Sequence, residues 1–426
     1  MSRTMDPGPI RTSPPPRSSL PRVLLLLPTA TYRAEAFVVA ARRAGVDLTV
    51  ASELPSTLET AQPEALLTLD FLNVERAVEQ ARAFATRYPV VAALGVDDDT
   101  VVLATAINAL LGRESNPLAA ALAARDKHRQ REQLAKAGVP VPSSTLHHMD
   151  EDAQALAARI RYPCVIKPLR LSASRGVIRA DDPASFAVAQ QRLGKILESC
   201  GDSAGHYLVE EFVPGGEVAL EGLLVRDRLH VLALFDKPDP LDGPFFEETI
   251  YVTPSRHPAA RQAAIVACAA AAARALGLRE GPVHAELRWN DRGPWLIELA
   301  ARSIGGRCSA VLRFGEASVG LEEILLRQAA GLPLPSLERE AGAAGVMMIP
   351  VPGAGRLREV QGIDAARAVP GIDDVVITAH RGQDLVPWPE GSRYPGFIFA
   401  RAPSPREAEQ ALRAAHAHLR FIMDEQ

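Results

Sequence analysis

The sequence is poor in cysteine and lysine and has no long apolar run. Its four cysteines form no CxxC pair, which excludes the common zinc-site and disulfide patterns; they are Cys164, Cys200, Cys268 and Cys308. We interpret them as reduced thiols in the core of a cytoplasmic protein. Only five of the 47 basic residues are lysines. A chain that carries its surface charge on arginine can keep lysine where a compact ammonium is needed, so Lys127, Lys167 and Lys237 become candidate binding residues.

The chain also lacks the charge pattern of a nucleic-acid or membrane-surface protein. Its net charge is -4, its pI is near 6.2, and it has no long basic run. The apolar stretch 23–27 is far shorter than the roughly 20 residues that span a bilayer, and the alanine-rich stretch 263–278 is interrupted by Arg274. We therefore predict no nucleic-acid or membrane partner, a buried first strand and a packed alanine-rich helix.

The 426 residues are expected to form about three domains after a disordered tail. Residues 1–20 are rich in Pro, Ser and Arg without apolar periodicity, which is typical of disorder. Residues 21–120 alternate apolar strands with helices, which predicts a parallel α/β domain. Residues 121–332 predict an α+β domain. After the proline-rich segment LPLPSL, residues 335–426 predict a small domain of antiparallel strands, closed by a helix over 405–423.

Two glutamates are predicted to face each other across a β-hairpin. The segments VHAEL and WLIEL are joined by WNDRGP, and a three-residue loop over 291–293 would set Glu286 directly opposite Glu298. Like charges in this position destabilise a sheet unless a cation lies between them. Mg²⁺, or Mn²⁺ in its place, is a hard cation that binds carboxylate oxygens together with nucleotide phosphates. A four-residue loop would make the pair diagonal, and two exposed glutamates are the simpler alternative.

An arginine and two glycines follow this hairpin. Arg302 lies four residues after Glu298, where a guanidinium can hold a phosphate or a developing negative charge. Gly305 and Gly306 allow the backbone to approach a ligand closely. Asp97, Asp98 and Asp99 could touch a substrate at the domain interface, but a helix N-terminus explains them without any ligand.

A second set of motifs indicates nucleotide binding, although the chain has neither a GxxxxGK[ST] loop nor GxGxxG. Lys167 ends an apolar strand and is followed by a small-residue loop that could cover phosphates. In YLVEEFVPGGE, the backbone after Val209 could read an adenine edge, and Glu217 could accept the ribose hydroxyls. Lys237 ends the next strand.

In this order, these motifs resemble those of the ATP-grasp superfamily over residues 20–332. The HAE strand, the GPFFEE stretch at 243–248 and ELAARSIGG are most similar to bacterial L-amino acid ligases and related carboxylate–amine ligases. The resemblance implies a mixed α/β and α+β architecture, the ATP-grasp fold. A Rossmann-like pre-ATP-grasp domain would span 21–120, an ATP-grasp domain with a hinge near 210–216 would span 121–332, and a C-terminal α+β domain of the ligase type would span 335–426.

The resemblance also implies roles for individual residues. Arg302 would stabilise the acyl phosphate and the tetrahedral intermediate, with His284 near the substrate as a second catalytic residue, and Glu286 and Glu298 would hold Mg²⁺ or Mn²⁺. Substrate would contact Glu247, Glu248, Gly305 and Gly306. The residues implied for ATP are Lys127, Lys167, Ser174, Arg175, Gly176, Glu210, Glu211, Val213, Glu217 and Lys237.

Two features depart from the general ATP-grasp pattern. The phosphate loop has one glycine where the superfamily has several. Ala300 stands where most ATP-grasp enzymes have Asn, which weakens a second-metal ligand but fits the L-amino acid ligase branch.

The function that this resemblance implies is ATP-dependent ligation of a carboxylate and an amine, both expected to be amino acids, through an acyl phosphate. The products would be an amide or dipeptide, ADP and phosphate. A biotin-carboxylase-like or purine-pathway enzyme is the main alternative, although Ala300 argues against it and no lysine after Lys237 could carry biotin. A non-catalytic ATP-binding module is a further alternative. A homodimer is compatible with this reading.

Overall fold

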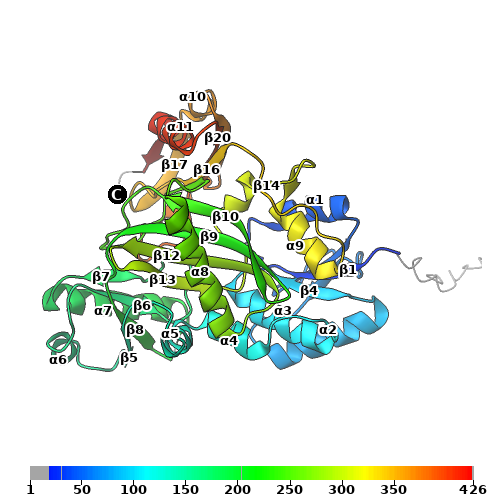
Figure 1. Cartoon of the computed structure of the whole chain (residues 1–426), viewed down its shortest axis with the longest axis horizontal. Coiled ribbons are helices and arrows are strands. Elements are labelled where there is room, and N and C mark those ends of the chain that lie inside the picture. Colours follow the sequence, from blue (N-terminus) through cyan, green and yellow to red (C-terminus); the bar gives the residue numbers. More distant parts are fainter. Residues whose placement is uncertain (1–18, 30, 203, 425–426) are drawn as a thin grey trace, which may run out of the picture.

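The computed structural model describes residues 19–29, 31–202 and 204–424. The predicted disordered tail therefore lies outside the described residues up to residue 18. The described part is a mixed α/β structure with a four-stranded parallel sheet near the N-terminus, a four-stranded antiparallel sheet and an eight-stranded antiparallel sheet (Figure 1).

The N-terminal domain is built on a parallel sheet in the order β3-β2-β1-β4. Leu24 and Leu26 pack toward one face of this sheet, while Val23 and Leu25 pack toward the other. Both faces are covered, which explains why the first strand is continuously apolar. The elements are β1 (Arg22–Leu26), α1 (Ala34–Ala44), β2 (Asp47–Ser52), β3 (Leu66–Thr68), α2 (Val74–Arg87), β4 (Ala92–Gly95) and α3 (Asp98–Leu110).

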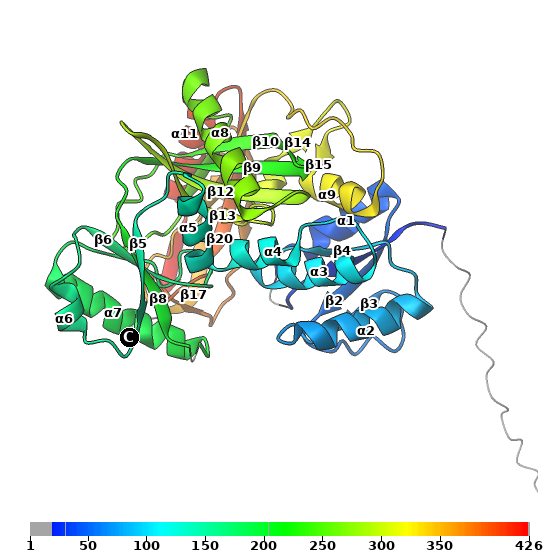
Figure 2. The ribbon, with the colours of Figure 1, turned by 60° about the horizontal axis from the view of Figure 1, so that its bottom comes forward.

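A second, four-stranded sheet has the order β5-β8-β6-β7 and is antiparallel. Figures 1 and 2 place it and the N-terminal domain on opposite sides of the molecule. Asp126 caps the helix that leads into it by accepting hydrogen bonds from two backbone amides. The elements are α4 (Leu118–Arg125), α5 (Lys127–Lys136), β5 (Ser144–His148), α6 (Ala153–Ala157), β6 (Cys164–Pro168), β7 (Ile178–Ala180), α7 (Pro183–Ser199) and β8 (His206–Glu211).

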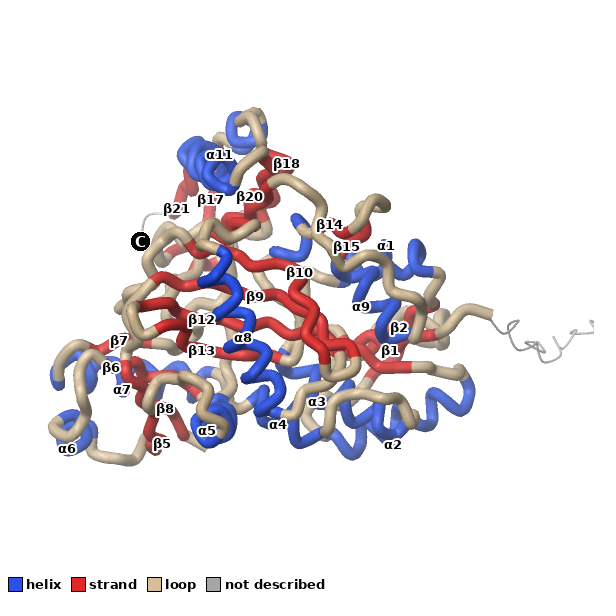
Figure 3. The backbone as a smooth tube through the Cα atoms, in the orientation of Figure 1, coloured by secondary structure: helices blue, strands red, loops and turns tan. Residues whose placement is uncertain are grey.

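The central sheet has eight antiparallel strands in the order β13-β12-β9-β10-β11-β16-β20-β18. Figure 3 shows the helix α8 lying across the strands of this sheet. The elements up to residue 330 are β9 (Gly216–Val225), β10 (Arg228–Lys237), β11 (Ile250–Thr253), α8 (Ala259–Leu276), β12 (Gly281–Asn290), β13 (Gly293–Ala300), the 3-10 helix η1 (Cys308–Val311), β14 (Arg313–Phe314), β15 (Val319–Gly320) and α9 (Leu321–Ala330).

The last part of the chain extends the same sheet. β11 pairs with β16, so that Ile250 lies opposite Met347. The helix predicted over 405–423 is shorter than expected, because α11 ends at His418 and a strand follows. The elements are β16 (Ala343–Met348), β17 (Gly355–Gln361), α10 (Ile363–Arg367), β18 (Ile372–Ile377), β19 (Asp384–Leu385), β20 (Gly396–Ala402), α11 (Pro405–His418) and β21 (Arg420–Met423).

The alanine-rich helix α8 packs on the central sheet, as predicted. By length and composition it is the one helix among the described residues that could cross a membrane. Its buried residues Ile265, Ala269 and Ala272 instead belong to one apolar cluster with Val218 and Leu287 of the sheet. Small alanine side chains let the helix lie close to the strands that carry the site.

Candidate active site

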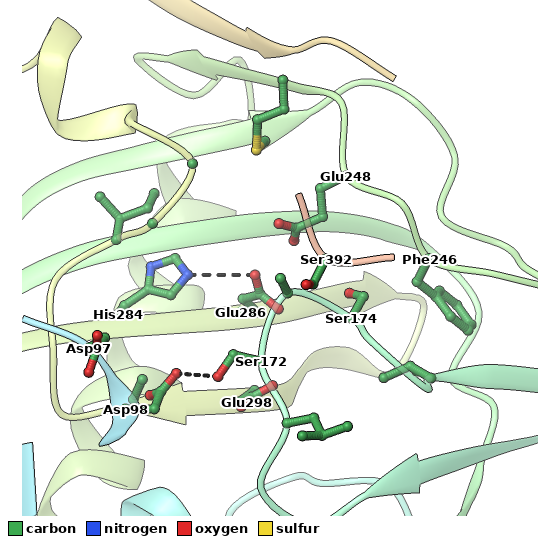
Figure 4. A pocket seen from close by; sticks show the side chains of 18 of the residues that line it. Asp97, Asp98, Ser172, Ser174, Phe246, Glu248, His284, Glu286, Glu298 and Ser392 are labelled. Carbon is green, nitrogen blue, oxygen red and sulfur yellow. Dashed lines mark hydrogen bonds and ion pairs between the residues drawn. The ribbon is translucent and has the colours of Figure 1, made fainter. Parts of the chain in front are cut away.

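One large cavity, with a volume of about 740 Å³, lies where the three sheets meet. Its wall includes residues from the N-terminal domain, both antiparallel sheets and the C-terminal part of the chain (Figure 4). Most of the predicted site residues line it: Lys127, Lys167, Ser174, Glu210, Glu211, Val213, Glu217, Glu248, His284, Glu286, Glu298, Arg302, Gly305 and Gly306. Lys237 lies against this wall through its contacts with Glu217, Glu248 and Glu286.

Glu286 and Glu298 are direct partners in the β12–β13 hairpin, as predicted, but the local reason differs. Asn290 pairs with Gly293, so only two residues connect the strands. A bulge between Glu286 and Leu287 then shifts the register by one residue, which brings the glutamates opposite each other. The predicted three-residue loop was therefore wrong, while the facing pair was right.

Each glutamate of the pair meets a lysine. Glu298 Oε1 lies 3.0 Å from Lys127 Nζ, and Glu286 Oε1 lies 3.0 Å from Lys237 Nζ. Lys237 also contacts Glu217 and Glu248, both at 2.6 Å. Three carboxylates therefore surround one buried ammonium, which stabilises negative charges that would otherwise repel one another.

The same carboxylates form a donor set suited to a hard cation. Oxygens of Glu217, Glu248 and Glu286 lie within 4.8 Å of one another. Glu298 adds a fourth carboxylate on the adjacent strand, and its side chain is 34% exposed to the cavity. Carboxylate oxygens at this spacing fit Mg²⁺ or Mn²⁺, and the Lys237 ammonium already marks a place where positive charge is favoured.

The buried Glu210 is held by two cations. Lys167 Nζ lies 2.8 Å from Glu210 Oε2, and Arg131 Nε donates to Glu210 Oε1 at 2.7 Å. Burial by itself raises the pKa of Glu210, but Arg131 and Lys167 outweigh it and the pKa is lowered. Arg131 also donates to the carbonyl of Ile297, the residue that the hairpin bulge leaves unpaired. This arginine was not predicted, although it lies one helical turn after Lys127.

The strand connection after β8 presents both backbone and carboxylate groups to the cavity. Glu211 is exposed and accepts a hydrogen bond from Ser143 Oγ at 2.8 Å. The Val213 carbonyl accepts a hydrogen bond from Arg288, which also lies 3.1 Å from Glu217 Oε2. Arg288 is a second arginine that was not predicted. It fixes the connection against the strand that carries Glu286.

The β6–β7 loop, residues 169–177, covers one side of the cavity. Ser174 lines the cavity, whereas Arg175 and Gly176 are directed to the C-terminal part of the chain. Ala173 and Ser174 have φ values of 55° and 54°, which cost L-residues roughly 1–2 kcal/mol each. Surrounding contacts must therefore hold this loop in its conformation.

His284 lies between two glutamates. Its Nδ1 is 3.6 Å from Glu221 and its Nε2 is 3.5 Å from Glu286 (Figure 4). Burial alone would lower the pKa of His284. The two carboxylates have the larger, opposite effect, and together they raise this pKa to about 9. Burial raises the pKa of Glu221, whose Oε2 accepts a hydrogen bond from the Ile304 amide at 2.9 Å. This arrangement joins the carboxylate pair to the segment that carries Arg302.

Arg302 is anchored by the N-terminal domain. It donates to Asp98 Oδ2 at 3.0 Å, and Ser172 Oγ of the β6–β7 loop donates to the same oxygen at 2.7 Å. Asp97 caps α3, as the sequence indicates, yet all three aspartates also line the cavity. The helix terminus therefore explains only part of their role, and no local pattern reveals that Asp98 has a partner 204 residues away.

The predicted substrate residues separate into two groups. Gly305 and Gly306 line the cavity, and a Cβ added to Gly306 would lie 2.5 Å from the sulfur of Met348. Glu248 also lines the cavity; burial raises its pKa, to about 7. Glu247 is absent from the described cavity wall and accepts a hydrogen bond from the Val351 amide at 2.8 Å.

Comparison with known proteins agrees with this geometry. Residues 160–311 match the family model of the ATP-grasp domain, so this part of the chain contains an ATP-grasp domain. Residues 347–424 match the L-amino acid ligase C-terminal domain 2. The chain therefore combines an ATP-grasp domain with a C-terminal domain of this type.

Three similar proteins illustrate the relationship. An L-amino acid ligase from Bacillus licheniformis shares the fold with a TM-score of 0.78 and 24% identity, over 95% of this chain and 99% of that one. An ATP-bound carboxyaminoimidazole ribonucleotide synthase from Aspergillus clavatus has a TM-score of 0.70 and 17% identity, over 94% and 99%. Dapdiamide A synthase from Enterobacter agglomerans is 29% identical over 55% of this chain and 54% of its own length. The chain matches about half the length of such curated relatives.

Proposed function

We propose that this protein is an ATP-dependent ligase that joins a carboxylate to an amine, with amino acids as both substrates. The observation that carries the proposal is the opposed pair Glu286 and Glu298, which shares one cavity with Arg302 and two lysines, while a third lysine contacts Glu286. Anionic metal ligands beside several cations suit the binding and transfer of a phosphoryl group. The similarity to proteins named as ligases supports the same conclusion. A cytoplasmic location is part of the proposal, because ATP is available there.

The nucleotide would lie along the wall formed by Lys167, Glu210 and the connection after β8. Lys127, Lys167 and Lys237 would exchange their present carboxylate contacts for phosphate oxygens. Glu286 and Glu298 would hold a divalent cation, which neutralises phosphate charge when bound. The β6–β7 loop would exclude water from the phosphates, since phosphoryl transfer to water would waste ATP.

The reaction would proceed in two steps. A substrate carboxylate oxygen first bonds to the γ-phosphorus as the bond to the ADP oxygen breaks, which gives an acyl phosphate. The amine nitrogen then attacks the acyl carbon, loses a proton, and expels phosphate as the carbon–oxygen bond breaks. Negative charge develops on the acyl oxygen in the second step, and Arg302 lies beside the carboxylate pair in a position to stabilise it.

The test is a screen of amino-acid pairs for ATP-dependent phosphate release, with products identified by mass spectrometry. A dipeptide or amide formed together with equimolar ADP supports the proposal, and Arg302→Ala serves as the inactive reference. ADP release that requires bicarbonate and no amine would instead favour the biotin-carboxylase-like alternative. ATP binding without ADP release for any pair would indicate a non-catalytic module.

A further inference from the structure

The β6–β7 loop is held by three consecutive residues of the C-terminal part of the chain. Trp388 Nε1 donates to the Ala173 carbonyl at 2.7 Å. The Gly176 amide donates to the Pro389 carbonyl at 2.9 Å. These contacts lie at both ends of the stretch that has left-handed backbone angles. They therefore stabilise the part of the loop where the backbone is strained.

Two arginines, one in the loop and one in α7, also bind the C-terminal segment at Glu390. Arg175 Nε donates to the Glu390 carbonyl at 3.0 Å, across 215 residues of sequence. The Glu390 carboxylate is bound by Arg192 of α7 through two contacts, at 2.5 and 2.9 Å. Planar bidentate pairs of this kind fix direction as well as distance. The same C-terminal segment is therefore tied to the loop and to the helix behind it.

The attachment site is itself rigid. The Trp388 side chain is buried, with 3% of its surface exposed, and its ring lies 4.8 Å from that of Tyr394. Two residues beyond Glu390, Ser392 lines the same cavity as Ser174 and Glu286 (Figure 4). The C-terminal segment thus meets the loop at the wall of the cavity that holds the carboxylates.

We propose that Trp388, Pro389 and Glu390 position the β6–β7 loop over the phosphates of ATP, so that nucleotide entry and release require this contact to open. The proposal rests on the proposed function for the identity of the nucleotide. It explains how a loop with a single glycine keeps two non-glycine residues in left-handed conformations. Additional glycines would adopt these backbone angles without strain. In this loop, hydrogen bonds from the C-terminal segment stabilise the same angles instead.

The test compares Trp388→Phe, which keeps a ring but removes the N–H donor, with the full-length parent chain. We expect the association and dissociation rates of an ATP analogue both to rise about fivefold, the factor that corresponds to one typical hydrogen bond. Trypsin cleavage after Arg175 should also become several times faster, and the analogue should slow it in both proteins. Trp295→Phe is the matched control, because it removes an equivalent hydrogen bond to Asn290 away from the loop.

A second variant covers the case in which Trp388→Phe does not fold. Glu390→Arg should accelerate cleavage after Arg175, and the charge-exchanged double variant Glu390→Arg with Arg192→Glu should return it toward the parent rate. Cleavage rates and nucleotide association and dissociation rates that match the Trp295→Phe control would overturn the proposal. Neither readout needs an amino-acid substrate, so a failed ligase screen and a failed loop attachment are distinguishable.

Discussion

Arg302 and Asp98 form a hydrogen-bonded ion pair at 3.0 Å that joins the central sheet to the N-terminal domain. Their side chains are 17% and 14% exposed. Beside these residues, Arg33 of the N-terminal domain donates to Ser303 Oγ at 2.6 Å. The position of the arginine therefore depends on two domains, and its freedom to turn toward a substrate is limited by Asp98.

Arg302→Ala should reduce kcat and kcat/KM together by about a hundredfold, which corresponds to about 3 kcal/mol of lost transition-state stabilisation. Affinity for ATP should remain near normal, because the residue lies beside the carboxylate pair and away from Glu210. Arg302→Lys should recover little, since an ammonium cannot reproduce the guanidinium fork. Steady-state kinetics check this, and a raised KM for ATP with kcat preserved would make Arg302 a nucleotide-binding residue instead.

Glu298→Gln should abolish turnover while leaving the metal-free protein about as stable as the parent, because relief of the repulsion with Glu286 offsets the lost ion pair with Lys127. The change removes one carboxylate from the facing pair and keeps the side-chain shape. Melting curves with and without Mg²⁺ and ATP provide the measurement, because a ligand that binds only the folded state raises Tm. Equal stabilisation of parent and variant by Mg²⁺ and ATP together would contradict a metal role for the pair.

Lys237→Met should destabilise the protein more than Lys167→Met. The first change leaves three clustered carboxylates without their cation and should cost about 3–5 kcal/mol. The second leaves Glu210 bound by Arg131 and should cost roughly 1–2 kcal/mol. Urea unfolding measures both free energies, and Lys195→Met on the exposed side of α7 is the control. Lys237→Met and Lys167→Met should also bind ATP more weakly than the parent protein.

The Lys237→Met variant also tests whether the three carboxylates around Lys237 can bind a divalent cation. Mg²⁺ should stabilise Lys237→Met more than the parent protein, because Glu217, Glu248 and Glu286 would then offer their oxygens to the added ion. An identical effect of Mg²⁺ on the two proteins would mean that the three oxygens do not act as a cation site.

Cys200 should be the one thiol among the four that reacts rapidly with iodoacetamide at pH 8 in the native protein. It is partly exposed, whereas Cys164, Cys268 and Cys308 are buried. Burial raises the pKa of Cys164 to about 12 and that of Cys268 to about 11, so almost no thiolate is present at these positions. Mass spectrometry should find one label, none in Cys200→Ser, and four after unfolding. Early labelling of Cys308 would show that the cavity admits the reagent.

The sequence predicted those features of the site that depend on local patterns. Strand-ending lysines and a short hairpin with a carboxylate on each strand bring Lys167, Lys237, Glu286 and Glu298 to one cavity. The facing pair was found despite a wrong loop length, because the bulge at Ile297 compensates by one residue. Bulges leave little trace in sequence, and this outcome was not derivable from the hairpin rule alone.

Contacts between distant segments could not be predicted. Asp98 looks like an ordinary helix-terminal aspartate until Arg302 and Ser172 are brought to it. Trp388 has no recognisable motif, and its role follows from the hydrogen bond to Ala173. Arg131 did have a signal, since it lies on the same helical face as Lys127. Cys200 was expected in the core, but it ends α7 at a partly exposed position.

The pairing of β11 with β16 limits how this protein can be divided or recombined. The four residues of β11 are at most 2% exposed, and the strand is covered by pairing with Ala343–Met348. A chain cut at the proline-rich segment 332–337 would expose an apolar edge that invites aggregation. Exchange of the C-terminal part between relatives would succeed only where both strands are compatible. New substrate preferences are therefore reached more easily by changing cavity side chains than by transplanting the whole segment.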